Sequence, residues 1–504
     1  MPAPTSSDVT AHSPVRSQAH VWFAAGCKET SLKEFADAAV SFRRALEIDP
    51  SWPEAKHNLG RALFELGQIH EAMALFREVA DSNVPELSRR AIAVTIPGSP
   101  SDGNAAILDA RRAWAETYLP QARPPGRFAD RRRATGEPLR VGYLSSFFQH
   151  EKWMKPVWSL INQHDRRSIE VHLFCDAPRS RITREYRARE NDGFHDISGL
   201  SNQEAANRIE HCEIDLLVDL NGYSAVPRLP LVALRPAPVI VGWFNAYATT
   251  GMACYDYLIG DEDVIPPDEE KFHCEKILRV RGSYLTFEIS YPVPPVASLP
   301  WSTKRAITFG CLASQYKIND EVLDAWCGIL RQVPNSSLIL RNTALTSPGN
   351  RRFVQAMFEK RDVSPSMLSL RGGLDHYRFL RTYDEIDVAL DTFPYNGGTT
   401  TTEAIWQGVP VVTFAGDRWA SRTSASILRA GNLGQFIASG IQGYISLAVS
   451  LGSGAGPRET LAELRSTMRC RLAASSVCDT ESFAQSMERL YHEMTSPAAN
   501  RAGD

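Results

Sequence analysis

VALDTFPYNGGTTTTEAIWQGVPVVTFAGD, residues 388–417, is the stretch of the sequence that decides the fold. It opens with an apolar strand that ends at Asp391, passes through a glycine loop at 396–398, and enters a helix through four threonines at 399–402. A second apolar strand, 409–413, follows the helix. This order predicts a parallel α/β unit with a ligand at the carboxyl end of its first strand.

The loop in this stretch has the composition of a phosphate-binding turn. Gly397 and Gly398 allow the backbone to approach a ligand closely. The first turn of the following helix offers free N–H groups and a partial positive charge, and the hydroxyls of Thr399 and Thr400 add donors. Glu403, one turn further on, is placed to accept hydrogen bonds from ribose. The alternative is an ordinary capped helix start without a ligand. The apolar strand that follows the helix favours the phosphate-binding turn, because the longer pattern is more specific than the loop alone.

Strands and helices alternate on both sides of this unit as well. The expected strands are 139–145, 170–174, 214–220 and 238–243 in a first set and 307–310, 337–341 and 368–371 in a second; the expected helices are 202–211 and 320–332, the latter capped by Asn319. Such alternation predicts two doubly wound, Rossmann-like α/β lobes with a ligand cleft between them. A last helix over 479–494 is expected to pack back on this body.

A lysine in the second lobe is the candidate partner of the phosphate turn. Lys317 follows the strand 307–310 and precedes the helix 320–332, so it is expected at the mouth of the cleft. A cation in that place would stabilise the charge of a departing diphosphate. The alternative is an exposed surface lysine, as most lysines are.

The first hundred residues carry a repeat. Gly26 and Phe42 recur 34 residues later as Gly60 and Phe76, and this is the tetratricopeptide period. Two units bury too little core alone, so a further helix around Trp114 is expected to support them. The resulting all-α arm is interpreted either as a docking surface for peptide segments of partners or as a structural cap.

Between the arm and the first lobe, residues 123–140 are rich in proline, glycine and arginine. The segment is interpreted as a solvated linker, with phosphate contact by the arginines at 131–133 as the alternative.

Composition excludes several classes of protein. The net charge of −3 argues against a nucleic-acid partner held by broad electrostatics. The nine cysteines form no CxxC pair and no His/Cys cluster with zinc-finger spacing, so we expect reduced thiols and no metal. Neither a signal peptide nor a membrane-length apolar run is evident, which predicts a cytoplasmic protein without membrane partners. No GxGxxG follows the first strand of either lobe, so a dehydrogenase is a poor fit.

Six motifs in order resemble the O-GlcNAc transferase family, including its bacterial and SPINDLY-like members. They are Val141–Ser145, Asp219–Tyr223, Leu234–Pro238, Tyr316–Ile318, Asp391–Pro410 and Ala420–Arg422. The resemblance implies a GT-B fold and an inverting, metal-independent transferase that moves GlcNAc from UDP-GlcNAc to Ser or Thr hydroxyls of proteins, without a cofactor. The alternatives are the same fold with another donor or acceptor, such as GDP-fucose, and a non-catalytic scaffold that binds nucleotide.

The resemblance also assigns roles and boundaries. It implies donor binding by Tyr316, Lys317, Asn396, Gly397, Gly398, Thr399, Thr400 and Glu403. The predicted organisation is a tetratricopeptide arm over 1–96, a helical linker over 97–138, an acceptor-side lobe over 139–300 and a nucleotide-sugar lobe over 301–504. Protein acceptors are expected to engage the arm.

The chain departs from the family pattern at several positions, and it is the sugar and acceptor side that is altered. The loop at 243–249 differs, the family histidine near the nucleotide base is replaced by Phe379, and His150 is displaced by about one residue. The candidates for removing the acceptor proton, together with Lys317 as the catalytic cation, are His150 and Tyr223. Tyr223 has the alternative of packing within its loop.

Overall fold

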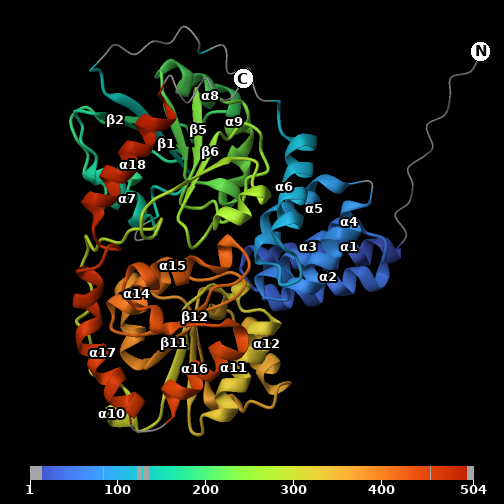
Figure 1. The fold of residues 1–504 in the computed structure, drawn as a ribbon. Helices are drawn as coiled ribbons and strands as arrows, with labels where there is room; N and C mark the ends of the chain where they lie inside the picture. The colour runs from blue at the N-terminus through green and yellow to red at the C-terminus, as the bar shows by residue number, and fades with distance from the viewer. Residues whose placement is uncertain are drawn as a thin grey trace, which may run out of the picture.

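The computed structural model describes residues 14–82, 84–121, 128, 136–150, 153–453 and 456–496. Two parallel sheets with flanking helices form two stacked lobes, and a helical arm lies beside their junction (Figure 1). The linker predicted over 123–140, with its arginines at 131–133, lies mostly outside the described residues. This arrangement confirms the predicted fold class.

The arm is a stack of antiparallel helices. Its elements are α1 (Pro14–Ser31), α2 (Phe35–Ile48), α3 (Pro53–Glu65), α4 (Ile69–Ala80), α5 (Pro85–Thr95) and α6 (Asn104–Tyr118). A Cβ at Gly26 would lie 2.7 Å from the ring of Phe42, and a Cβ at Gly60 would lie 2.7 Å from the ring of Phe76. The 34-residue repeat therefore reflects one packing requirement. In each unit a glycine in the first helix leaves room for the ring of a phenylalanine in the second helix.

The N-terminal lobe holds a seven-stranded parallel sheet in the order β3-β2-β1-β4-β5-β6-β7. Its strands are β1 (Leu139–Ser145), β2 (Ile169–Cys175), β3 (Gly193–Asp196), β4 (Leu216–Asp219), β5 (Val239–Gly242), β6 (Tyr257–Gly260) and β7 (Lys276–Arg279). Its helices are α7 (Lys155–Gln163), α8 (Asn202–His211) and α9 (Leu229–Ala233). The central strands β1, β4 and β5 are nearly continuous apolar runs because helices cover both faces.

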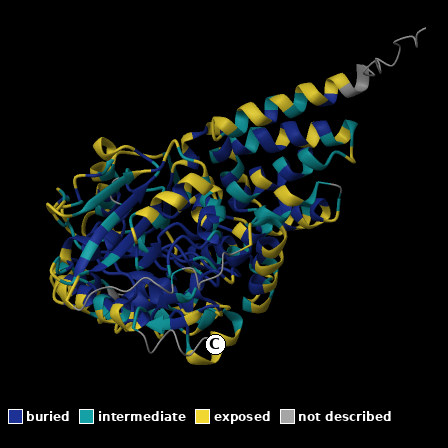
Figure 2. Cartoon of the chain, turned by 90° about the horizontal axis from the view of Figure 1, so that it is seen from above, coloured by how far each residue is buried: buried dark blue, intermediate teal, exposed yellow. Residues whose placement is uncertain are grey.

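The C-terminal lobe repeats this plan with six strands in the order β10-β9-β8-β11-β12-β13. The strands are β8 (Thr308–Cys311), β9 (Ser337–Arg341), β10 (Leu368–Arg371), β11 (Val388–Leu390), β12 (Val411–Phe414) and β13 (Ile437–Ala438). The helices are α10 (Trp301–Lys304), α11 (Asp320–Gln332), α12 (Pro348–Glu359), α13 (His376–Leu380), α14 (Thr399–Trp406), α15 (Thr423–Ala430), α16 (Gly440–Gly452) and α17 (Gly456–Ala473). Figure 2, a view from above, shows a largely buried interior under partly exposed helices.

The chain crosses between the lobes twice. After α17 it returns to the N-terminal lobe, where α18 (Thr480–Met494) packs against α7, as Figure 1 shows. At this crossing the backbone N–H of Phe287 donates to the carbonyl of Val477 over 2.8 Å. On α18, Glu488 Oε1 lies 2.9 Å from His164 Nδ1 of the first lobe. The predicted closing helix is therefore confirmed, and it ties the C-terminal end of the body to the first lobe.

The arm docks on both lobes rather than projecting freely. In α6, Arg111 donates to the carbonyl of Thr249 over 2.7 Å, beside the N-terminal sheet. The α3–α4 turn meets the C-terminal lobe at Gly67, where a Cβ would overlap the carbonyl oxygen of Ile318. Gly67 also has a φ of +87°, which favours glycine. A glycine is therefore needed here both for the backbone conformation of the turn and for the close approach to Ile318.

Within the described ranges, no helix is both long and apolar enough to span a lipid bilayer.

Candidate active site

The glycine loop between β11 and α14 is organised by a buried carboxylate. Asp391, 6% exposed, accepts hydrogen bonds at Oδ1 from the N–H of Thr392 over 2.9 Å and from that of Gly397 over 2.8 Å. Its Oδ2 accepts from the hydroxyl of Thr413 on β12 over 2.8 Å. Burial raises the pKa of Asp391, and these donors oppose that shift. The strand-end aspartate therefore fixes the backbone course of the turn.

Gly397 and Gly398 differ in what surrounds them. A Cβ at Gly397 would lie 2.6 Å from Thr401 Oγ1 and 2.8 Å from Thr400 Oγ1. A Cβ at Gly398 would meet only carbon atoms at 3.6 Å, and α14 begins directly after it. Packing therefore requires a glycine at Gly397, whereas a Cβ at Gly398 would make only ordinary van der Waals contacts. The N–H groups of Thr401 and Thr402 donate to the carbonyl of Gly398 over 3.0 and 3.2 Å, which leaves those of Thr399 and Thr400 without a partner in the helix to present positive potential.

Lys317 lies over this turn, on the short helical segment that follows β8. Its Nζ donates to the carbonyl of Asn396 over 2.7 Å and lies 3.9 Å from the ring centroid of Tyr395. Burial lowers the pKa of Lys317 to about 8, while the carboxylate of Asp391 opposes that shift. The structure thus brings Lys317 and the turn together.

Asn396 offers a further group to a ligand. Its Nδ2 donates to the carbonyl of Thr392 over 2.7 Å. Its Oδ1 is buried without a hydrogen-bond partner among the described residues, so a ligand hydroxyl that reached it would satisfy an acceptor.

Tyr316 faces the arm as well as the turn. Its ring stacks on Phe64 of α3 at 5.2 Å and lies 6.1 Å from the ring of Tyr395. Tyr395 in turn lies 5.3 Å from Tyr247, in the 243–249 loop of the N-terminal lobe. This row of rings joins the arm and both lobes beside the ammonium of Lys317.

Glu403 lies on α14 and is engaged by the opposite lobe. Its carboxylate Oε1 accepts from Lys155 Nζ over 2.6 Å, and the two side chains are 4% and 1% exposed. His376 Nε2 stands 3.4 Å from the same oxygen and 3.1 Å from the hydroxyl of Tyr291. Burial raises the pKa of Glu403, and Lys155 opposes the shift. Glu403 is therefore the centre of a buried polar cluster that bridges the two lobes.

Three members of this cluster were not predicted from the sequence: Lys155, Tyr291 and His376. Lys155 opens α7, so the segment after β1 places a lysine in the contact between the lobes, whereas the residue predicted there was His150. His376 lies one turn before Phe379 on α13, and the two rings stack at 6.0 Å. An imidazole thus lies one turn from the position where the family histidine is replaced. These residues belong to three separate segments, so no local pattern marked them.

The two candidate bases are placed differently. His150 is exposed after β1, with its ring at 5.8 Å from Phe147 and 6.3 Å from Trp153. Tyr223 is 5% exposed, and its hydroxyl donates to the carbonyl of Thr250 over 2.8 Å. Burial raises the pKa of Tyr223. These contacts favour the alternative given for Tyr223, which is packing.

The arm explains why Tyr223 is buried. Arg111 of α6 lies over its ring, 4.0 Å from the centroid, and Trp114 of the same helix lies 5.7 Å away. Tyr223 therefore anchors α6 to the N-terminal lobe.

Two Rossmann-like lobes, with a lysine over a glycine–threonine turn at their junction, define the class of GT-B glycosyltransferases. The chain belongs to glycosyl transferase family 41, whose model matches residues 119–289 and 299–487. A tetratricopeptide repeat model matches residues 30–92.

Individual relatives agree with this placement. A lysine-to-methionine mutant of O-GlcNAc transferase from Thermobaculum terrenum has a similar structure, with a TM-score of 0.83 and 30% identity, covering 96% of this chain and 92% of that one. The probable UDP-N-acetylglucosamine--peptide N-acetylglucosaminyltransferase SPINDLY of Oryza sativa subsp. japonica is 30% identical over 394 residues. That match covers 77% of this chain and 42% of the rice protein. The Caenorhabditis elegans UDP-N-acetylglucosamine--peptide N-acetylglucosaminyltransferase is 24% identical, over 71% of this chain and 41% of that protein. The chain thus spans about two fifths of the length of these curated relatives.

Proposed function

We propose that this chain transfers GlcNAc from UDP-GlcNAc to Ser or Thr hydroxyls of proteins, with inversion and without a metal ion at the reacting centre. The observation that carries the proposal is the position of Lys317 Nζ, 2.7 Å from the carbonyl of Asn396 in the glycine loop that leads into α14. The names of the rice and worm relatives support this donor and a peptide acceptor, and that of the bacterial relative supports O-GlcNAc transfer.

The leaving diphosphate is stabilised by charges that are already in place. In the proposed reaction it lies against Gly398, Thr399 and Thr400, where N–H groups at the start of α14 donate hydrogen bonds to the anion. The ammonium of Lys317 approaches from the other side and neutralises the charge that develops as the glycosidic bond breaks. Positive charge from the protein then does what a metal ion does in other transferases.

The donor's remaining polar groups have partners nearby. In this proposal the ribose hydroxyls donate to Glu403, whose carboxylate is held by Lys155 over 2.6 Å and keeps further lone pairs for a second donor. The unpartnered Oδ1 of Asn396 accepts from a donor hydroxyl. Lys155 thus orients the carboxylate rather than contacting the reacting atoms.

The acceptor hydroxyl must lose a proton as it attacks the anomeric carbon. Of the two candidate bases, His150 is the better placed, because it is exposed after β1 whereas the hydroxyl of Tyr223 is buried and bound to a carbonyl. We include in the proposal that acceptor proteins engage the repeat arm, whose α3–α4 turn contacts the segment that carries Lys317.

Calorimetric titration with UDP, UDP-GlcNAc and GDP, on the wild type and on Lys317→Ala, tests the donor site. We expect UDP and UDP-GlcNAc to bind the wild type and to lose about 10- to 100-fold in affinity in the variant, the value of a hydrogen bond to a charged group. Lys360→Ala, at the exposed end of α12, is the matched control. No binding of uridine nucleotides to the folded wild type would refute the donor assignment.

Transfer is measured separately, by the mass shift of Ser- and Thr-containing peptides incubated with UDP-GlcNAc or with GDP-fucose. A HexNAc shift with UDP-GlcNAc, lost in Lys317→Ala, supports the proposal. A deoxyhexose shift with GDP-fucose assigns the same fold to another donor. UDP-GlcNAc binding without transfer to any peptide would favour the scaffold alternative.

A further inference from the structure

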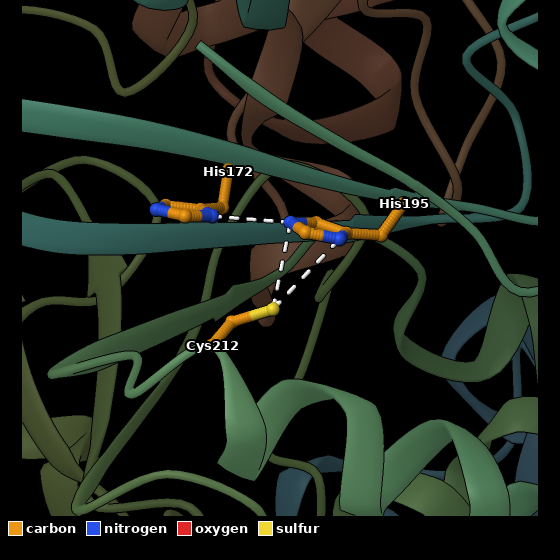
Figure 3. A group of neighbouring side chains, drawn as sticks. All are labelled: His172, His195 and Cys212. Atoms are coloured by element: carbon orange, nitrogen blue, oxygen red, sulfur yellow. Dashed lines mark hydrogen bonds between the residues drawn. The ribbon is translucent and has the colours of Figure 1, made fainter. Parts of the chain in front are cut away.

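Outside the candidate active site, three potential metal ligands converge at the edge of the N-terminal sheet. They are His172 on β2, His195 on the edge strand β3 and Cys212 directly after α8. Their ligand atoms all lie within 4.8 Å of one another. Figure 3 shows the two imidazole rings side by side with the sulfur of Cys212 beneath His195.

The spacings approach those of a tetrahedral zinc site. Nδ1 of His172 lies 3.1 Å from Nε2 of His195, which lies 3.6 Å from the sulfur of Cys212. With Zn–N near 2.05 Å and Zn–S near 2.3 Å, tetrahedral geometry places two nitrogens about 3.3 Å apart and a nitrogen and a sulfur about 3.6 Å apart. An ion displaced from the N–N line toward Cys212 is therefore within reach of all three atoms after a modest rotation of the rings.

A carboxylate already orients the first ligand. Nε2 of His172 lies 2.8 Å from Oε1 of Glu170, so the ring N–H points at the carboxylate and the lone pair of Nδ1 points at His195. A carboxylate behind a histidine is the usual outer partner of a metal-bound imidazole. Gly193 makes the arrangement possible, because a Cβ there would lie 2.5 Å from His172 Nδ1.

The chemistry of the three side chains also suits a cation. A bound zinc ion deprotonates a coordinating thiol outright, so the thiol form of Cys212 is no obstacle. A neutral imidazole offers one ring nitrogen as a ligand, and His172 and His195 supply one such nitrogen each.

We propose that His172, His195 and Cys212 bind one zinc ion, with water as the fourth ligand. On binding, the thiol of Cys212 releases its proton to solvent, and the proton of His195 moves from Nε2 to Nδ1, so that each metal-facing atom offers a lone pair. The ion joins the four-residue edge strand β3 to the end of α8 and stabilises the edge of the sheet. None of the residues assigned to donor binding lies on these elements, so the site is separate from a metal-independent reaction.

No zinc-finger spacing is present in the sequence, because the three proposed ligands lie far apart along the chain. His172 and His195 are 23 residues apart, and His195 and Cys212 are 17 apart, each on a different element. The β2–β3 pairing brings the first two together, and the return through α8 supplies the third.

Zinc affinity is measured on the full chain after chelator treatment, by competition with a chromogenic chelator. We expect one zinc ion per chain in the wild type and at least about 100-fold weaker binding in Cys212→Ala and His195→Ala, each of which removes a ligand. Glu170→Gln and Gly193→Ala retain all three ligands but disturb their orientation, and we expect about 10- to 100-fold weaker binding.

Two exposed residues supply matched controls, and Co²⁺ supplies a readout that needs no variant. His211→Gln, beside Cys212 on the chain, and Cys470→Ser leave the site intact and should bind zinc as the wild type does. Co²⁺ added to the wild type should give tetrahedral ligand-field bands and a thiolate-to-cobalt charge-transfer band. The inference is overturned if Co²⁺ gives no thiolate band, or if the wild type binds zinc no more tightly than Cys212→Ala; the three residues then form only a hydrogen-bonded cluster.

Discussion

The ion pair between Lys155 and Glu403 yields a sharp prediction, because it is buried and joins the two lobes. Its atoms are 2.6 Å apart and its side chains are 1% and 4% exposed. Removing one partner of such a pair leaves an uncompensated buried charge and costs about 3–5 kcal/mol. His376 stands 3.4 Å from the same carboxylate oxygen and offsets part of this cost. We therefore expect Lys155→Met to lower stability by about 3 kcal/mol, the low end of that range.

The double variant decides whether charge is the cause. The double variant Lys155→Met/Glu403→Gln leaves no buried charge of this pair unpaired. We therefore expect its loss of stability to be smaller, by at least about 1 kcal/mol, than the sum of the losses in the two single variants. The assay is thermal unfolding followed by tryptophan fluorescence, read at the first transition because a two-lobed chain need not unfold in one step. A loss of about 3 kcal/mol corresponds to a shift of roughly 6–12 °C for a lobe of this size.

A surface pair in the arm supplies the comparison. Lys56 and Glu78 are 20% and 57% exposed, and Lys56→Met should cost less than about 1 kcal/mol. The reasoning is refuted if Lys155→Met costs no more than Lys56→Met, or if the two single effects in the buried pair simply add.

Three further predictions concern the turn and its neighbours. Because burial lowers the pKa of Lys317 to about 8, its charge is present below that pH and lost above it. UDP affinity should therefore fall by up to about tenfold per pH unit above pH 8, with proton uptake on binding. Calorimetry on Lys317→Met should show a weak affinity that does not depend on pH. Gly397→Ala should lower the free energy of unfolding by about 1–3 kcal/mol, since its Cβ would lie 2.6 Å from a threonine hydroxyl. Gly398→Ala, whose Cβ would have neighbours at 3.6 Å, should keep a free energy of unfolding within about 1 kcal/mol of the wild type. Equal shifts in melting temperature for the two variants would contradict this. Gly67→Ala, in the arm, should displace the short helical segment that carries Lys317 and so weaken UDP binding. Gly60→Ala should destabilise the arm without weakening UDP binding. Identical UDP affinities in the two folded variants would contradict this prediction.

Much of the fold was predictable because local signals and periodicity agree. The helix 320–332 was predicted with its cap, and Asn319 indeed accepts from the N–H of Val322 over 2.9 Å. The strands β3, β6, β7 and β13 were not predicted. Three of them, β3, β7 and β13, are edge strands whose burial is mixed rather than continuous, so their place is set by pairing with one neighbour instead of by an apolar run.

The candidate site likewise has a part that could be predicted from the sequence and a part that could not. The glycine–threonine turn and Lys317 each lie beside a recognisable strand, so the sequence located both. The partner of Glu403 could not be located, because the contact joins residues 248 positions apart on different lobes. Tyr223 shows the converse: its motif suggested chemistry, but the arm helix packed over it decides its environment.

The return of α18 to the N-terminal lobe has a consequence for how the protein is made. The β1 strand leaves the ribosome long before residues 480–494, yet the hydroxyl of Tyr143 on β1 donates to that of Tyr491 over 3.2 Å, and the ring of Phe483 packs 6.0 Å from Trp243. Domains generally fold as they emerge, N-terminal ones first. Here the first lobe to be synthesised must wait, with part of its apolar surface uncovered, until the whole second lobe has been translated. The order of synthesis and the order of completion are therefore reversed in this chain.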